Sequence, residues 1–139
     1  MTEPNSCYAY FAVYGDDIDP AGLTQELGVA PTKEWRKGDL DPRHRERSTG
    51  HWALYSRLDR TAELEDHLHD VLLQMDANAE AFHAVASRFD GIMQLVGHFH
   101  DIGAGLNLSK SALARLAFYG LHLDLDSYYL YSDSRECTG

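Results

Sequence analysis

The fold is decided by the stretch CYAYFAVYGDDIDPAGLTQELG, which covers residues 7–28. Small and apolar residues alternate with tyrosines from Cys7 to Tyr14, and this period of two is typical of a strand with one buried face. Asp19 then precedes Pro20, and Gly28 follows Leu27, so the second half carries the start and stop signals of a short helix. The stretch therefore predicts a strand followed directly by a helix.

The same signals recur along the rest of the chain. Helices are expected to begin at Thr61, Asn78 and Ser109, and strands are expected at 51–58, 92–100 and from residue 121 onward. Runs of strands and helices in this order are typical of an α+β protein. We expect a mostly antiparallel sheet with helices packed on one face, a ferredoxin-like sandwich. It would form a single domain over 1–139 with a loose tail at 132–139.

Composition narrows the class of protein. The chain has 139 residues, of which 44% are hydrophobic, enough for one core. No apolar run reaches the length of a membrane helix, and the polar start is unlike a secretory signal, so we expect a cytoplasmic protein without a membrane partner. Cys7 is expected to be a buried thiol and Cys137 a thiol of the tail; a bridge between them is the alternative.

Charge is strongly negative and uneven. The formal net charge is −10, with 22 carboxylates against 12 Lys and Arg, which disfavours binding to nucleic acid. Six of the 12 cations lie between Lys33 and Arg47, together with four carboxylates. An acidic body therefore carries one mildly basic loop, expected at 31–50, and long loops in small domains are often functional.

The basic loop supplies the candidate partner-binding residues. Trp35 is expected either to anchor the loop to the core, which we favour, or to anchor a partner to the loop. The cations nearby are expected to be solvated, with an anion or an acidic partner as the alternative. A small ligand held between sheet and loop is a third possibility. The candidate residues are Trp35, Arg36, Lys37, Arg43, Arg45 and Arg47.

Tyrosines form a second candidate surface. Tyr8, Tyr10 and Tyr14 share one side of the first strand, and Tyr55 with Arg57 follows in the second strand. Sheets that bind RNA stack bases on such aromatic residues, but the acidic charge of this chain argues against RNA. We expect half-buried packing or a protein-binding face.

Histidines and aspartates form the third candidate, a metal site. In a strand, His98 and His100 would project to one face, and His122, Asp124 and Asp126 of a neighbouring strand could complete a set of ligands for zinc or another divalent cation. A solvated sheet face explains the same residues, and we favour it. His67 and Asp70 on the helix after Thr61 are likewise expected at a solvated surface.

Three regions of the chain resemble domain-of-unknown-function family 4279, a bacterial family of small α+β domains. The first runs from Ile18 to Asp39 and the second surrounds Gly50-His51-Trp52. The third leads from Leu108-Ser109 through Leu116-Ala117 and Gly120 into Leu123-Asp124-Leu125-Asp126 and Tyr128. The resemblance implies a compact α+β domain with no catalytic residue, substrate or cofactor to carry over. Some members resemble immunity proteins that neutralise bacterial toxins.

These observations favour a binding protein over an enzyme. The sequence contains no phosphate-binding glycine loop, serine elbow or His-Glu-x-x-His motif, so enzyme activity is unsupported and no catalytic residue or cofactor is expected. The leading hypothesis is a protein-binding domain, specifically an immunity protein whose acidic surface meets a basic toxin. The alternative is a metal-binding protein or metal-dependent enzyme that uses His98, His100 and His122. The sequence does not determine an oligomeric state.

Overall fold

β1 forms the centre of a five-stranded sheet in the computed structural model, which describes residues 4–101 and 105–130. The strand order is β2-β3-β1-β4-β5. The strands are antiparallel except for the parallel pair β4 and β5. Their bounds are β1 Ser6–Gly15, β2 Lys33–Trp35, β3 Gly50–Tyr55, β4 Ile92–Phe99 and β5 His122–Tyr129.

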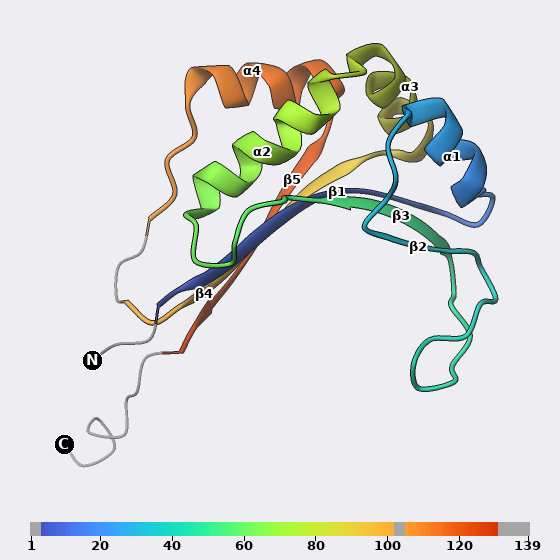
Figure 1. Cartoon of the computed structure of the whole chain (residues 1–139), viewed down its shortest axis with the longest axis horizontal. Coiled ribbons are helices and arrows are strands. Elements are labelled where there is room, and N and C mark those ends of the chain that lie inside the picture. The colour runs from blue at the N-terminus through green and yellow to red at the C-terminus, as the bar shows by residue number, and fades with distance from the viewer. Residues whose placement is uncertain (1–3, 102–104, 131–139) are drawn as a thin grey trace.

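Helices gather on one face of this sheet and leave the other face uncovered (Figure 1). The helices are α1 Pro20–Leu27, α2 Leu64–Asp76, α3 Ala79–Phe89 and α4 Lys110–Tyr119. The prediction of an α+β protein with a mostly antiparallel sheet is confirmed. The elements from β1 to β4 have the order of a ferredoxin-like fold, and α4 with β5 adds a parallel edge strand.

Helix ends follow the local signals in the sequence. Pro20 opens α1, and Gly28 ends it with φ 74°, where its N–H donates to the carbonyl of Thr24. Ser109 caps α4 because its hydroxyl accepts from the N–H of Ala112 at 3.0 Å. Among the described residues, no helix has the length and apolar character needed to cross a membrane.

The core lies between the helices and the inner face of the sheet. Phe11 of β1 packs edge-on against Phe82 of α3 and Trp52 of β3, with ring centroids 5.4 and 6.3 Å away. Cys7 is buried as predicted, and Cys137 lies outside the described residues, as does the predicted tail at 132–139. This packing fixes which side of each strand faces outward.

Three expectations differ from the structure. α2 begins at Leu64 rather than Thr61, because Thr61 instead bonds to the Asp59 carboxylate in the preceding turn. The loop expected at 31–50 contains β2 and an isolated bridge between Leu40 and Glu46. His67 and Asp70 are buried, not solvated, because this flank of α2 faces the segment that follows β3.

Candidate functional site

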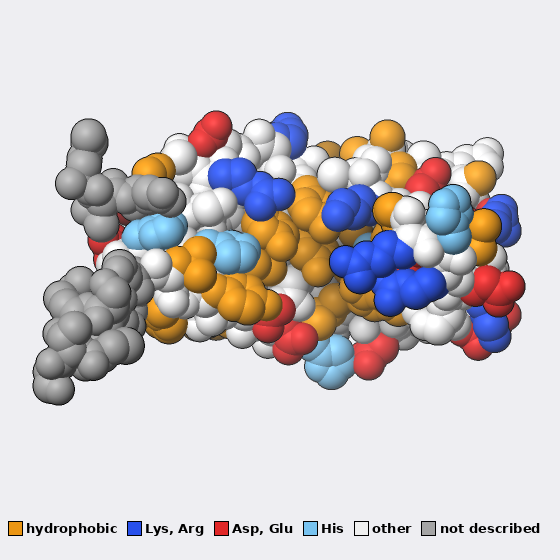
Figure 2. All heavy atoms as spheres, turned by 90° about the horizontal axis from the view of Figure 1, so that it is seen from below, with side chains coloured by type: hydrophobic (Ala, Val, Ile, Leu, Met, Phe, Trp, Pro, Cys, Tyr) orange, Lys and Arg blue, Asp and Glu red, His pale blue; other side chains and the backbone are white. Residues whose placement is uncertain are grey.

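The uncovered face of the sheet is the candidate site. Strand alternation puts Tyr8, Tyr10 and Tyr14 of β1 on this face. On β3, Tyr55 lies opposite Tyr10 and His51 lies opposite Tyr14. Figure 2 shows hydrophobic side chains along its middle and Lys and Arg mostly in its upper half and on the right; Asp and Glu lie along its lower edge and also at its upper edge and right end. The predicted tyrosine surface therefore exists as one continuous face.

Three tyrosines stack on one another at its centre. The ring centroids of Tyr10 and Tyr55 are 4.4 Å apart, and Tyr8 lies 6.2 Å from Tyr10 and 5.9 Å from Tyr55, all with nearly parallel planes. Burial is the main cause that raises the pKa of the Tyr10 and Tyr55 phenols. These hydroxyls therefore remain protonated at neutral pH and can donate hydrogen bonds to a partner.

A second aromatic group surrounds His51. The centroid of the His51 ring lies 4.3 Å from that of the Trp35 ring and 4.5 Å from that of the Tyr14 ring. His51 is only 3% exposed. Burial, together with the charges of Lys33 and Arg47, lowers the pKa of His51 to about 4. His51 is therefore neutral at pH 7 and acts as an aromatic spacer between Trp35 and Tyr14.

Three cations lie over rings of this face. Arg47 is 3.8 Å from the Trp35 centroid, Arg60 is 4.2 Å from that of Tyr8, and Lys33 is 5.4 Å from that of Tyr55. No carboxylate of residues 4–101 or 105–130 forms an ion pair with any of the three. Six other cations do have such pairs: Arg36, Lys37, Arg45, Arg57, Arg88 and Arg115. The positive charge of Lys33, Arg47 and Arg60 is therefore not neutralised by a carboxylate of the described residues.

The opposite side of the face carries carboxylates. Asp124 and Asp126 of β5 lie beside Gln94 and Val96 of β4, and the Gln94 amide donates to Asp126 at 3.2 Å. β5 is three strands away from β3, about 14 Å at the usual spacing between strands. The face is thus polarised, with cations towards β2 and carboxylates along β5.

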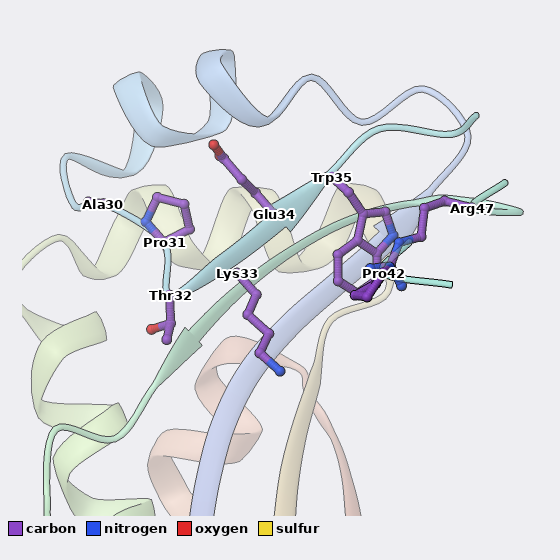
Figure 3. Close-up of a pocket in the computed structure, with 8 residues that line it drawn as sticks. All are labelled: Ala30, Pro31, Thr32, Lys33, Glu34, Trp35, Pro42 and Arg47. Carbon is purple, nitrogen blue, oxygen red and sulfur yellow. The ribbon is translucent and has the colours of Figure 1, made fainter. Parts of the chain in front are cut away.

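A pocket opens at the β2 edge, where the long loop returns to the sheet (Figure 3). Its lining includes Lys33, Glu34, Trp35, Pro42 and Arg47. The Trp35 indole N–H donates to the carbonyl of Thr49 at 3.0 Å, which holds the end of the loop against β2. The Nε of Arg47 is buried and has no hydrogen-bond partner within the described residues. Trp35 thus packs on the uncovered face and closes the loop there, whereas Trp52 is the tryptophan of the core.

The structure divides the predicted loop residues into two groups. Trp35 and Arg47 come together at the pocket. Arg36 pairs with Asp19 at 2.5 Å and Lys37 with Asp16 at 3.1 Å, so both tie the loop to the region around α1. Arg45 pairs with Asp41 inside the loop, and the backbone N–H of Arg43 donates to the same carboxylate.

The predicted metal ligands are spread along the β4 and β5 edge. His98 stacks on Tyr128, whereas His122 lies beside Ile92 and bonds to Asp90 at 2.9 Å. Because β5 runs parallel to β4, His122 lies six residues along the strand from the level of His98, about 20 Å. Within the described residues, no three His, Cys, Asp or Glu side chains form a group that could hold a metal. His98 and His122 therefore do not form a metal site together with His100, Asp124 or Asp126 among the described residues. Metal binding stays a prediction.

Sequence reasoning missed two cations of the face and misplaced a third. Lys33 alternates with Trp35, but this signal can be read only after β2 is recognised. Arg60 lies outside regular structure and has no signal in the sequence. Arg57 was expected beside the tyrosines; its guanidinium instead bonds to Asp70 of α2 at 2.7 Å, because the chain leaves the sheet after Tyr55.

Comparison with known proteins gives one match. Neither a curated protein nor a solved structure matches the chain significantly. The family model described as "Domain of unknown function (DUF4279)" matches residues 5–130, which is most of the chain and confirms the resemblance found in the sequence. The match covers every strand and helix described above. The chain therefore belongs to the DUF4279 family.

Proposed function

We propose that this protein is a non-enzymatic binding domain of the cytoplasm, and that a protein partner docks on the uncovered sheet face. The observation that carries the proposal is the row of aromatic side chains on this face, with three cations over its rings and no carboxylate paired to them. Aromatic residues and Arg dominate the energetics of protein interfaces. The face thus has the composition of an interface core.

A protein partner fits this face better than RNA. Bases stack on exposed ring faces, but here the rings of Tyr8, Tyr10 and Tyr55 lie against each other, and cations cover Tyr8 and Tyr55. The net charge of −10 repels phosphate over the rest of the surface. We therefore propose no nucleic-acid partner.

The more specific role that we propose is neutralisation of a bacterial toxin. Asp124 and Asp126 along β5, together with the acidic body, would meet a basic region of such a toxin. Co-expression with the product of a neighbouring gene tests this role. The domain should copurify with that product and protect cells from it. Absence of both effects would reject the toxin-neutralising role while leaving the binding face to be tested separately.

Site-directed photocross-linking in the native host tests the face itself. A photoreactive phenylalanine analogue at Tyr10 should give one defined protein adduct, because this residue lies at the centre of the face. The matched control places the analogue at Leu73, which is 52% exposed on α2. Equal adducts from both positions, or none from Tyr10, would contradict the proposal.

A further inference from the structure

Lys33 and Arg47 line the pocket at the β2 edge, and neither forms an ion pair within the described residues. Both lie on the same side of β2 as Trp35. Glu34 also lines the pocket, and in Figure 3 its carboxylate points away from Lys33 and Arg47. Arg47 stacks on the Trp35 ring, and its Nε is buried with no acceptor among the described residues. A buried guanidinium N–H without an acceptor is unfavourable, and an oxygen atom supplied by a ligand would satisfy it.

Two cations without an ion pair within the described residues meet at this position. The chain has 22 carboxylates for 12 cations, so partners for Lys and Arg are in excess. Six cations elsewhere in the described structure do pair with carboxylates, including Arg36 and Lys37 at the start of the same loop. Arg43, Arg60 and Lys110 likewise have no ion pair within the described residues, but of these unpaired cations only Lys33 and Arg47 line the pocket.

We propose that the pocket accepts the carboxylates of an acidic segment of the protein partner. This inference rests on the proposed function and adds the chemistry of the contact. Arg47 would donate to a carboxylate oxygen, Lys33 would neutralise a neighbouring acidic side chain, and the Trp35 ring would pack against aliphatic carbons of the segment. A basic region of the same partner can lie over Asp124 and Asp126, because the face is polarised.

Binding of an oligo-glutamate peptide to the full chain tests the inference. The labelled peptide should bind at low ionic strength and dissociate as salt is added, as measured by fluorescence anisotropy. Lys33→Gln together with Arg47→Gln should weaken binding by about tenfold, since charge-assisted hydrogen bonds are lost. Arg47→Lys should weaken it less. The control is Lys110→Gln, which removes an exposed cation from α4 that likewise has no ion pair within the described residues.

Several results would overturn the inference. One is absence of peptide binding; another is an equal loss in Lys110→Gln, which would mean unspecific attraction. Tighter binding of oligo-uridine RNA than of oligo-glutamate would assign the pocket to another class of ligand. Thermal unfolding of each variant verifies that it is folded. A cross-link at Tyr10 without glutamate binding would reject this inference alone, whereas glutamate binding without any cross-linked protein would reject the proposed protein partner.

Discussion

The guanidinium of Arg47 lies 3.8 Å from the centroid of the Trp35 ring, so the last part of the long loop packs on its first residues. Trp35 also donates its indole N–H to the Thr49 carbonyl. Between these residues, backbone hydrogen bonds link Gly38 and Asp39 to Arg47. The loop is therefore closed at its base by one aromatic side chain on the uncovered face of the sheet.

Trp35→Ala should open this loop. It removes the cation–π contact and the hydrogen bond to Thr49, and we expect a loss of about 1–2 kcal/mol in the free energy that closes the loop. Trypsin cleavage after Arg43 and Arg45 should then accelerate by roughly 5- to 30-fold, as measured by mass spectrometry. Leu40→Ala, at a 62% exposed residue of the same loop, should leave the cleavage rate unchanged. An unchanged rate in Trp35→Ala would mean that other contacts close the loop.

The sequence predicts most of this fold because its strands and helices carry local signals. Alternation marks β1, β4 and β5, and Gly28 and Gly120 end their helices in the left-handed conformation that suits glycine. β2 escapes prediction because three residues cannot establish a period, and its register depends on pairing with β3. Recognition of Lys33 and Trp35 as neighbours on one face therefore required the structure.

His51 should make stability depend on pH. Its folded-state pKa is about 4, below the usual value near 6.5, so the neutral form favours the folded state. This contribution is complete above about pH 6.5 and is lost as pH falls towards 4, a change of about 3 kcal/mol in the free energy of unfolding. His51→Phe keeps a ring between Trp35 and Tyr14 but cannot be protonated. Its free energy of unfolding, measured in urea titrations, should therefore fall less in acid than that of the natural protein.

A comparison between variants separates the contribution of His51 to this pH dependence from that of the carboxylates, which also titrate in acid. Tyr14→Phe keeps the ring that packs on His51, and it should show the same loss between pH 7 and pH 4.5 as the natural protein. A parallel pH dependence in His51→Phe and the natural protein would show that His51 does not cause the loss.

Only part of the candidate site could be predicted from the sequence. Alternation placed the tyrosines on one face correctly, because register follows from the period of the strand. The metal hypothesis needed His122 beside His98, and this depended on strand direction. A parallel β5 puts His122 beside Ile92 instead, at the other end of the pair. His67 was misjudged because helical spacing alone does not reveal which flank of α2 is covered.

Gly50 should tolerate no side chain, which gives a physical reason for glycine before His51 and Trp52. A Cβ at this position would lie 2.7 Å from the Gly15 carbonyl oxygen and 3.0 Å from Cβ of Ile18. Gly50→Ala should therefore lower the free energy of unfolding by about 1–3 kcal/mol in urea titrations, because β1 and β3 must move apart. Gly105→Ala is the control, since nothing lies within 4 Å of its added Cβ. Equal stability of both variants would contradict the close approach.

The phenols of the uncovered face should ionise late in alkali. Burial raises the pKa of Tyr10, Tyr14 and Tyr55, and burial together with Asp76 raises that of Tyr119 in the core. Because the neutral forms favour the folded state, the free energy of unfolding should fall as pH rises above about 10.

Tyrosinate absorbance of the folded chain at alkaline pH should therefore fall short of that of the denatured chain, because Tyr10, Tyr14, Tyr55 and Tyr119 ionise at higher pH. Tyr10→Phe should reduce this difference in absorbance by the contribution of one phenol. Ionisation of all eight phenols at the same pH in the folded and denatured chains, with circular dichroism unchanged, would contradict the stacked arrangement. A confirmed difference means that these hydroxyls remain donors throughout the physiological range, which is the state that a carboxylate partner requires.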